Sequence, residues 1–123
     1  MDIKLFDSER KVMDVLWREG DQTAKRNSDN LKEEIGWNMN TTYTVIKKCI
    51  AKGAIRRTEP NFRCHALISK EEAQEAETEE LIEKLYDGSV DKLFAALLGR
   101  KKLTGEQIAN LKKIVADLDE AEA

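Results

Sequence analysis

The stretch Trp37–Gly53, with the sequence WNMNTTYTVIKKCIAKG, predicts one helix around which the rest of the chain is organised. Asn38 is a good N-cap because its short polar side chain can accept a hydrogen bond from an amide of the first turn. Gly53 is a good residue to end the helix, because glycine adopts the left-handed conformation without steric cost. One apolar stripe runs along this predicted helix through Val45, Ile46, Cys49 and Ile50.

The opposite face of the predicted helix is polar at its start and positively charged further on. Short polar groups at the leading end suit the base edges of a DNA major groove, and cations behind them suit phosphates. The predicted base-reading residues are Asn40, Thr41, Tyr43 and Thr44. The predicted phosphate contacts of the helix are Lys47 and Lys48. A solvated amphipathic helix with no role in DNA binding is the simpler alternative, since such helices are common.

Two short runs that suit β-strands follow the helix. Residues 54–58 and 62–68 flank the turn signal Glu59–Pro60–Asn61. In the second run Phe62, Cys64 and Ala66 fall on one side, because side chains alternate along a strand. A helix, a glycine and a small hairpin are the layout of a winged helix-turn-helix, in which the wing lies along the DNA backbone or in the minor groove. The arginines that the wing would present are Arg56, Arg57 and Arg63.

Two further helices are expected before the central one. Ser8 is the predicted N-cap of the first helix, because it is the nearest short polar residue before the apolar stripe. Asn27 or Ser28 is the predicted cap of the second helix, and Thr23 is an earlier alternative. We therefore predict a winged-helix DNA-binding domain over residues 1–69, in a fold that is mostly α with a small β hairpin.

The second half of the chain has a different character. Ser69 and Glu72 have the spacing of a capping box and begin a long helix, and Ser89 and Thr104 cap two more. Three helices of this size bury too little apolar surface alone. We therefore predict a three-helix dimerisation domain over residues 70–123, in a two-fold homodimer. The alternative is that these helices fold back onto the N-terminal domain in a monomer. The residues expected at the dimer interface are Leu81, Leu85, Leu93, Phe94, Leu97, Ile108, Leu111 and Val115.

Charge is distributed unevenly between the two halves. Residues 1–69 hold 13 Lys and Arg against 10 Asp and Glu, a net of +3, and residues 70–123 hold 8 against 14, a net of −6. A basic front joined to an acidic back is typical of a module that binds a polyanion and is attached to something else.

Several classes of protein do not fit this sequence. No apolar run is long enough to cross a bilayer, and the N-terminus lacks a signal-peptide pattern, so a cytoplasmic protein is expected. Cys49 and Cys64 are expected to be reduced, packed thiols, with a disulfide or redox switch as the less favoured alternative. Together with the single histidine, His65, they do not make a metal site, and no cofactor is expected. There is no nucleophile–base pair and no phosphate-binding loop, so an enzyme is not expected.

The motifs taken together resemble those of the penicillinase and methicillin-resistance repressors, the BlaI/MecI/CopY family. The similarity covers about residues 5–118. Its N-terminal part consists of the first-helix pattern from Glu9 to Trp17, Trp37 followed four residues on by Thr41, and Lys52–Gly53 before the hairpin. Its C-terminal part consists of residues 86–88, Tyr-Asp-Gly, and residues 103–108, Leu-Thr-Gly-Glu-Gln-Ile.

The resemblance implies a winged-helix repressor that binds a double-stranded, two-fold symmetric operator as a homodimer and controls a resistance or stress operon. It also implies release by an inducing signal, with a sensor protease or another inducer as a further partner. Two departures bear on that signal. The CxC pair of the copper-responsive members is missing, and Ala96–Leu97 stands where the cleaved members have Asn-Phe, which argues against the protease. Asn40 and Tyr43 replace cationic positions of the recognition face, so a different operator sequence is expected.

Two other functions remain open from the sequence. A winged helix can serve as a protein–protein interaction module, and such a module would show no salt-dependent affinity for DNA. A thiol- or ligand-sensing regulator is the other alternative, with Cys49 behind the recognition helix as its sensor.

Overall fold

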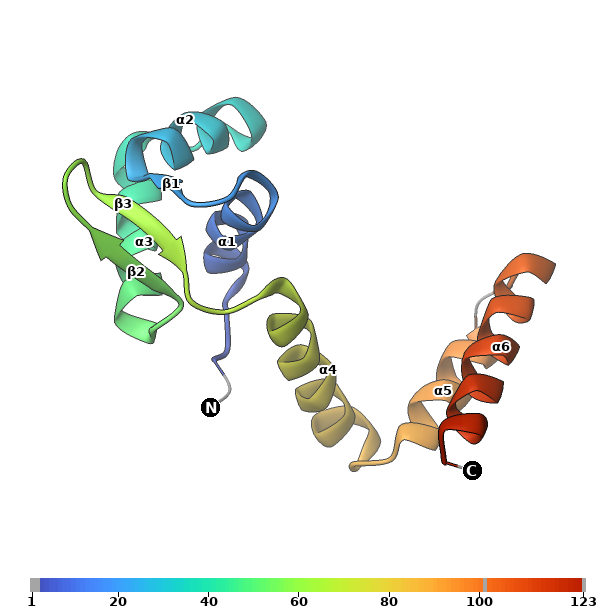
Figure 1. The fold of residues 1–123 in the computed structure, drawn as a ribbon. Helices are drawn as coiled ribbons and strands as arrows, with labels where there is room; N and C mark the ends of the chain where they lie inside the picture. Colours follow the sequence, from blue (N-terminus) through green and yellow to red (C-terminus); the bar gives the residue numbers. More distant parts are fainter. Residues whose placement is uncertain (1–2, 101, 123) are drawn as a thin grey trace. The chain divides into compact units, whose positions relative to one another are not determined.

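The computed structural model describes residues 3–100 and 102–122, and it shows a mostly helical chain with one small antiparallel sheet (Figure 1). The predicted fold class is confirmed. The chain divides into two compact units, one that ends at Glu80 and one that begins at Leu81. The elements in chain order are α1 (Asp7–Glu19), β1 (Gln22–Thr23), α2 (Ala24–Ile35), α3 (Met39–Lys52), β2 (Ile55–Thr58), β3 (Arg63–Ala66), α4 (Lys70–Tyr86), α5 (Val90–Arg100) and α6 (Gly105–Glu122).

The first helix, α1, begins before its predicted cap. Ser8 lies inside the helix, and Phe6 occupies the N-cap position, so the predicted cap is wrong. The carboxylate of Glu9 reaches back and accepts a hydrogen bond from the Phe6 backbone N–H at 2.7 Å. A helix start leaves several amides without partners. A first-turn carboxylate therefore does here part of the work that a polar N-cap side chain usually does.

The second helix, α2, also begins earlier than its favoured caps. The hydroxyl of Thr23 accepts a hydrogen bond from the Arg26 backbone N–H at 3.1 Å, which confirms the earlier alternative. Asn27 and Ser28 are buried in the body of the helix, so a cap at either residue is wrong. The side-chain amide of Asn27 instead donates to the backbone carbonyl of Val12 in α1 at 3.3 Å.

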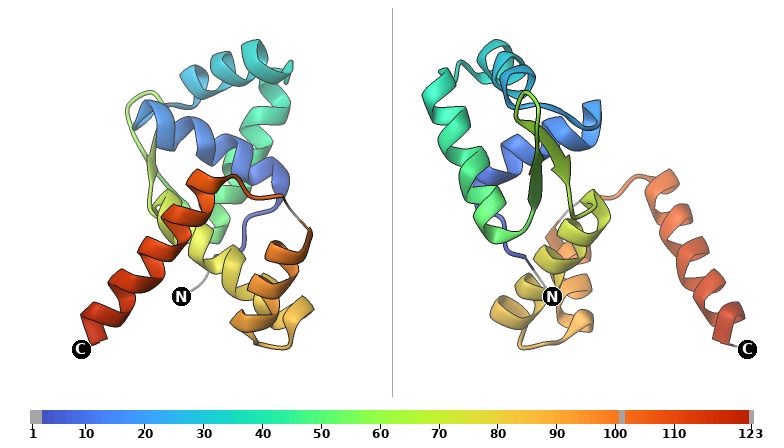
Figure 2. Two further views of the ribbon diagram at one scale, coloured as in Figure 1. Left: turned by 90° about the vertical axis from the view of Figure 1, so that its right-hand side faces the viewer. Right: turned by 60° about the vertical axis from the view of Figure 1, so that its left-hand side comes forward.

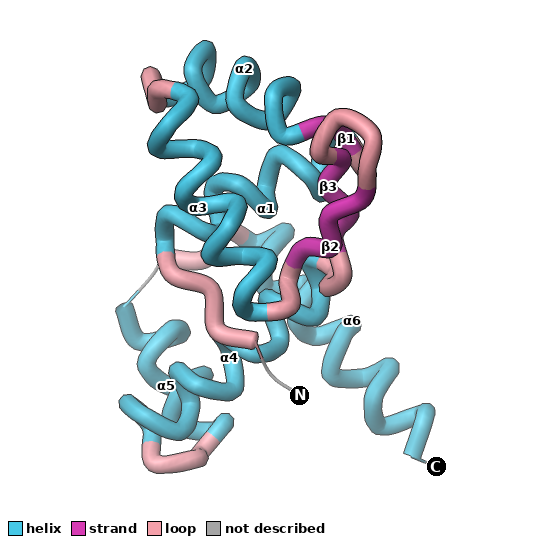
Figure 3. Tube along the Cα trace, turned by 90° about the vertical axis from the view of Figure 1, so that its left-hand side faces the viewer, coloured by secondary structure: helices cyan, strands magenta, loops and turns pink. Residues whose placement is uncertain are grey.

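The sheet has three strands in the order β1–β3–β2, all antiparallel. The predicted hairpin is present as β2 and β3, but the two-residue strand β1 was not predicted. Cys64 at the centre of β3 faces Gln22 on one side and Arg57 on the other. Figure 3 shows the strands, in magenta, beside α3, and Figure 2 shows the same arrangement from two further sides. The hairpin is therefore paired along its β3 edge by β1, and α3 lies beside it.

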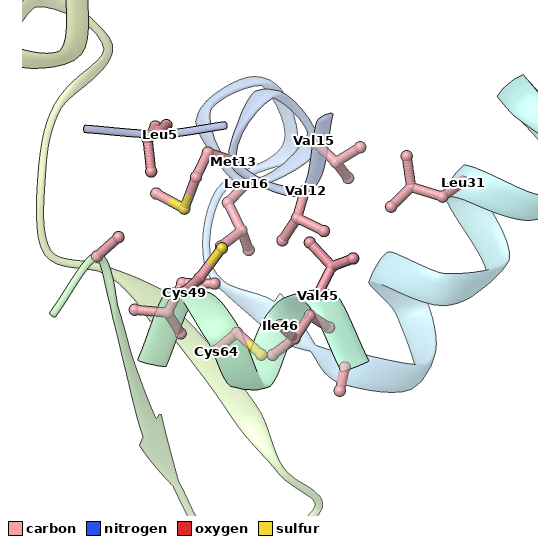
Figure 4. Close-up of a cluster of buried hydrophobic side chains, with 13 residues drawn as sticks. Leu5, Val12, Met13, Val15, Leu16, Leu31, Val45, Ile46, Cys49 and Cys64 are labelled. Atoms are coloured by element: carbon pink, nitrogen blue, oxygen red, sulfur yellow. The ribbon is translucent and has the colours of Figure 1, made fainter. Parts of the chain in front are cut away.

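One apolar core holds the first unit together. Figure 4 shows Val12 and Leu16 of α1 pointing toward Val45 and Ile46 of α3, with Met13 beside Leu5. Thirteen apolar side chains are buried in this core. They are Leu5, Val12, Met13, Val15, Leu16, Ala24, Leu31, Val45, Ile46, Cys49, Ala54, Ile55 and Cys64.

The start of α4 is fixed to this first unit. The indole N–H of Trp17 donates to the backbone carbonyl of Ile68 at 3.0 Å, and Ala73 packs against the core. The ammonium of Lys4 lies 2.8 Å from the carboxylate of Glu80. The predicted capping box at the start of α4 is confirmed by its two reciprocal hydrogen bonds.

The second unit is built from the end of α4 with α5 and α6. Ser89 caps α5 by accepting from the Lys92 backbone N–H at 3.2 Å. Thr104 and Gln107 form the expected capping box at the start of α6. No residue among the described side chains of 81–99 and 102–121 is buried. Across the described residues the structure contains no helix with the length and apolarity that a membrane span requires.

Candidate nucleic-acid interface

The recognition helix, α3, has the caps that its sequence predicts. The side chain of Asn38 accepts a hydrogen bond from the Thr41 backbone N–H at 2.8 Å. Gly53 ends the helix with a φ of 85°, and its backbone N–H bonds the carbonyls of the last turn. Both ends are therefore fixed by local chemistry, and the first turn is ordered at the point where it would meet DNA.

The face of α3 that points away from the core is the one predicted to contact DNA. Its exposed residues are Asn40, Thr41, Thr44, Lys47 and Lys48. The buried stripe behind it contains Thr42 in addition to Val45, Ile46 and Cys49, and the fourth predicted residue, Ile50, is only partly buried. The hydroxyl of Thr42 has no hydrogen-bond partner among the described residues.

Tyr43 differs from the other predicted base readers. Its ring is half-buried and packs against Phe62 of the wing, with ring centroids 5.7 Å apart and ring planes at 78°. This edge-on geometry is favourable for aromatic pairs. The structure thus brings the recognition helix and the wing together through Tyr43, a contact between residues far apart in the sequence that the strand pattern did not reveal.

The three wing arginines lie in different environments. Arg56 is exposed and has no ion-pair partner among the described residues. The guanidinium of Arg57 bonds the carboxylate of Glu59 at 2.6 Å and lies 3.6 Å from the centroid of the Phe62 ring. The hydrogen bond between them raises the pKa of Arg57 and lowers the pKa of Glu59. Arg63 donates to the backbone carbonyl of Asp21 at 3.1 Å.

The lysines of α3 also fall into two groups. Lys47 and Lys48 have no ion-pair partner among the described residues, and both are exposed. Lys52 lies 2.6 Å from the buried carboxylate of Glu9 and also bonds the backbone carbonyl of Lys4. Two cations of the helix are therefore available to an external anion, and the third is neutralised within the protein.

A row of three hydrogen-bonded side chains at the edge of the wing was not predicted from the sequence. The imidazole of His65 lies between the carboxylate of Asp21, 2.9 Å from its Nδ1, and the hydroxyl of Thr58, 2.7 Å from its Nε2. These contacts tie β2 and β3 to the loop before β1. The lone histidine on a strand was visible in the sequence, but nothing marked Asp21 as its partner.

Both cysteines belong to the core. Cys49 and Cys64 are free thiols with no exposed surface. Burial raises the pKa of Cys49 to about 12 and that of Cys64 to about 11. The thiolate is the reactive form of cysteine, so the environment of Cys49 disfavours a thiol sensor. No three His, Cys, Asp or Glu side chains gather into a possible metal site within the described part of the chain.

The predicted dimerisation residues all lie in the second unit. Leu93 and Leu111 are half-buried, and the others are exposed, Leu85 most of all at 68%. Side chains of α5 and α6 line an apolar groove of about 490 Å³. Among the predicted interface residues, those that line this groove are Phe94, Ile108, Leu111 and Val115.

Known proteins share both the sequence pattern and the fold. The chain is 23% identical to the methicillin resistance regulatory protein MecI of Mammaliicoccus sciuri over 120 residues, which is 94% of this chain and 98% of that protein. It is 22% identical to the penicillinase repressor of Bacillus licheniformis over 116 residues, 93% of this chain and 91% of that one.

The fold has a solved counterpart in the solution structure of the DNA binding domain of the repressor BlaI. That structure matches with a TM-score of 0.53 and 22% identity over 58% of this chain and 93% of its own. The family model described as penicillinase repressor matches residues 5–117. Because this match covers most of the sequence, the chain belongs to the penicillinase repressor family.

Proposed function

We propose that this protein is a DNA-binding transcriptional repressor that acts as a homodimer on a two-fold symmetric operator and controls a resistance or stress operon. The observation that carries the proposal is the exposed face of α3, where short polar groups lead and unpaired lysines follow, in a chain of the penicillinase repressor family. The names of its relatives, a methicillin resistance regulator and a penicillinase repressor, support the type of operon.

Sequence reading is assigned to the first turns of α3. Asn40 can make a bidentate contact with adenine, and the methyl groups of Thr41 and Thr44 can touch a thymine methyl. All three side chains are exposed, and the Asn38 cap keeps the first turn helical. Substituting Thr44→Ala should relax the preference at one base pair. Uniform weakening at every sequence would count against a base-reading role.

Phosphate binding is assigned to the cations that the protein itself leaves unpaired. On α3 and the wing, the cations without an ion-pair partner among the described residues are Lys47, Lys48 and Arg56. Arg63 is a secondary contact, because its guanidinium already donates to Asp21. Lys47→Ala should weaken binding to all sequences and reduce the salt slope by about 0.9, the value of one phosphate contact. A loss of sequence preference with an unchanged salt slope would instead make Lys47 a base reader.

The second unit is proposed to form the dimer. A group of helices in which no described side chain is buried gains little stability from packing within its own chain. A second copy of the same unit can cover the apolar groove of α5 and α6 in an isologous contact. Two recognition helices would then meet half-sites about 34 Å apart, one turn of DNA, or a multiple of that distance.

Two aspartate substitutions on α6 test the dimer. Val115→Asp places a charge in the groove, and Asn110→Asp, whose residue does not line the groove, adds the same charge elsewhere on the helix. Sedimentation equilibrium should show dimer association weakened, with the dissociation constant raised by roughly tenfold or more, only for Val115→Asp, because an unpaired charge is costly to bury. Equal behaviour of the two variants would remove the groove from the interface.

The first test of the whole proposal is a gel shift on the promoter region upstream of the protein's own gene. It is run at two salt concentrations with random DNA as competitor. A discrete complex with dimer stoichiometry that resists the competitor is expected. Equal binding to random DNA that disappears at the higher salt would leave only a generic basic surface, and no binding at either salt would favour a protein-interaction module.

A further inference from the structure

Tyr43 joins the two elements that are proposed to touch DNA. It lies on α3 one turn after Asn40, yet its ring is half-buried against Phe62 at the end of the wing loop. The other side chains proposed to read bases on that helix are exposed. A ring already engaged at 5.7 Å with another aromatic ring is poorly placed to reach into a groove as a free reader.

Phe62 is a fixed anchor and not a loose loop residue. Its backbone carbonyl accepts a hydrogen bond from the Ala24 N–H at the start of α2, at 2.9 Å. Its side chain packs against the apolar core. Phe62 and the preceding Asn61 both have positive φ, 49° and 70°, a conformation that non-glycine residues keep only where their surroundings determine it. A side chain that packs on Phe62 is therefore held in a defined position.

Arg57 completes the contact on the wing. Its guanidinium stacks 3.6 Å from the Phe62 centroid, and Glu59 holds it from the side. Cations over an aromatic face are stabilised by the ring quadrupole. Its neighbour Arg56 has neither kind of partner among the described residues. Both arginines are exposed, but Arg57 is engaged by Phe62 and Glu59, whereas Arg56 is left open to an external anion.

We propose that Tyr43, Phe62 and Arg57 form a stack that couples the recognition helix to the wing, and that Tyr43 is a positioning residue for DNA binding and not a base reader. The proposal rests on the DNA-binding function proposed above and specifies it. The stack fixes the distance between the major-groove contact made by α3 and the backbone contact made by the wing. Arg57 belongs to the stack, and Arg56 carries the phosphate contact of that strand.

The test uses the full-length protein and a DNA fragment selected by its binding. Tyr43→Phe keeps the ring and removes the hydroxyl, and Tyr43→Ala removes the ring. We expect Tyr43→Phe to bind within about twofold of the wild type with unchanged base preference, and Tyr43→Ala and Phe62→Ala each to weaken binding by about fivefold to tenfold. The double variant should be no weaker than either single one, because both remove the same contact.

Hydroxyl-radical footprinting supplies a readout that a general loss of stability would not give. Tyr43→Ala should lose the protection due to the wing and keep the protection due to α3. A changed preference at one base pair in Tyr43→Phe would overturn the proposal, as would full additivity of Tyr43→Ala and Phe62→Ala. If an alanine variant fails to fold, Tyr43→Phe still shows whether DNA binding depends on the hydroxyl or only on the ring.

The neighbouring arginines provide a matched pair. Arg56→Gln should reduce the salt slope of binding by about 0.9, and Arg57→Gln should leave it unchanged while weakening binding as Phe62→Ala does. Equal reductions of the slope would place both arginines on phosphates and overturn the assignment of Arg57.

Wild-type protein that selects no DNA at all would refute the proposed function, and with it the positioning role. The stack itself is tested without DNA by a double-mutant cycle of unfolding with Tyr43→Ala and Phe62→Ala. A coupling energy near zero there would refute the stack even if DNA binding is found, so the two failures are distinguishable.

Discussion

The two units of this chain use amphipathic helices in opposite ways. In the first unit, α1, α2 and α3 meet around thirteen buried apolar side chains. In the second unit the apolar residues are as evident in the sequence, yet the described side chains of 81–99 and 102–121 include no buried residue. Burial of apolar area is the main favourable term in folding. The first unit therefore closes its core with its own side chains, whereas the apolar side chains of the second remain available to another surface, as the proposed dimer requires.

The largest difference in folding between the two units is expected when they are separated into two fragments. A fragment of residues 1–80 keeps the whole core and should unfold cooperatively, with a midpoint that does not depend on concentration. A fragment of residues 81–123 should lose helicity on dilution, because short helices without packing are marginal in water. Circular dichroism from about 1 to 100 μM provides the measurement. Helicity of the second fragment that is independent of concentration would mean that α5, α6 and the end of α4 are stable as a monomer.

The next largest difference, in the free energy of unfolding, is expected when the same substitution is made in each unit. Ile46 of α3 is 0% exposed, and Ile114 of α6 is 57% exposed. Ile46→Ala should lower the free energy of unfolding of the first unit by about 2–5 kcal/mol, because it removes buried methyl groups and leaves a cavity. Ile114→Ala should change the stability by less than about 1 kcal/mol at concentrations where the chain is monomeric. Denaturant titrations of the two full-length variants make the comparison.

A large cost of Ile114→Ala at low concentration would contradict the contrast between the units. A loss of stability that appears only at high concentration would support the contrast between the units, because it would place Ile114 in a surface that the partner covers.

The ends of α3, α4 and α6 could be predicted from local sequence, whereas the single cap predicted for α1, Ser8, was wrong. Asn38 and Gly53 bound α3, and the boxes at Ser69 and Thr104 begin α4 and α6 as predicted. Such caps depend only on neighbours within a turn, so no knowledge of the rest of the fold is needed.

Starts that depend on tertiary contacts were not readable. Thr23 caps α2 because β1 pairs with β3 and holds residues 22–23 extended up to the helix start, and a two-residue strand has no pattern. Asn27 looks like a cap but is required inside the core, where it bonds Val12.

The candidate site also combines features set by the local sequence with features set by distant contacts. The polar and charged face of α3 could be predicted because helical periodicity separates it from the buried stripe. The partners that set its members apart, Phe62 beside Tyr43 and Glu9 beside Lys52, lie far along the chain. The sequence therefore predicted a set of DNA-contacting side chains, and the structure shows which of them already have partners within the chain.

High pH should destabilise the first unit through its buried thiols. Burial raises the pKa of Cys49 from 9.0 to about 12, so between these values the unfolded chain binds fewer protons than the folded one and stability falls as pH rises. The contribution is fully present below about pH 9, and on the order of 1 kcal/mol of it is lost by pH 10.

Cys49→Ala removes this titration, and the slope of stability against pH above pH 9 should be shallower than in the wild type. The comparison of slopes is independent of the cavity that the variant creates. Equal slopes would mean that the Cys49 thiol ionises as easily in the folded protein as in the unfolded chain. The second unit has no cysteine, so its dissociation constant should show no matching change.

The smallest change in stability is expected when one helix N-cap is removed in each unit. Asn38→Ala removes the acceptor of the Thr41 amide in a helix that packs on the core, and Thr104→Ala removes the acceptor of the Gln107 amide in a helix that does not. Each loss should cost about 1 kcal/mol. In α3 the cost should lower the global stability of the first unit, because fraying of its first turn exposes part of the core. In α6 the cost should stay local and appear as faster amide exchange in residues 105–108, with the unfolding of the first unit unchanged. If Thr104→Ala lowered the midpoint of the first unit as much as Asn38→Ala does, the two units would unfold as one, and the contrast between a self-sufficient core and a dependent one would be wrong.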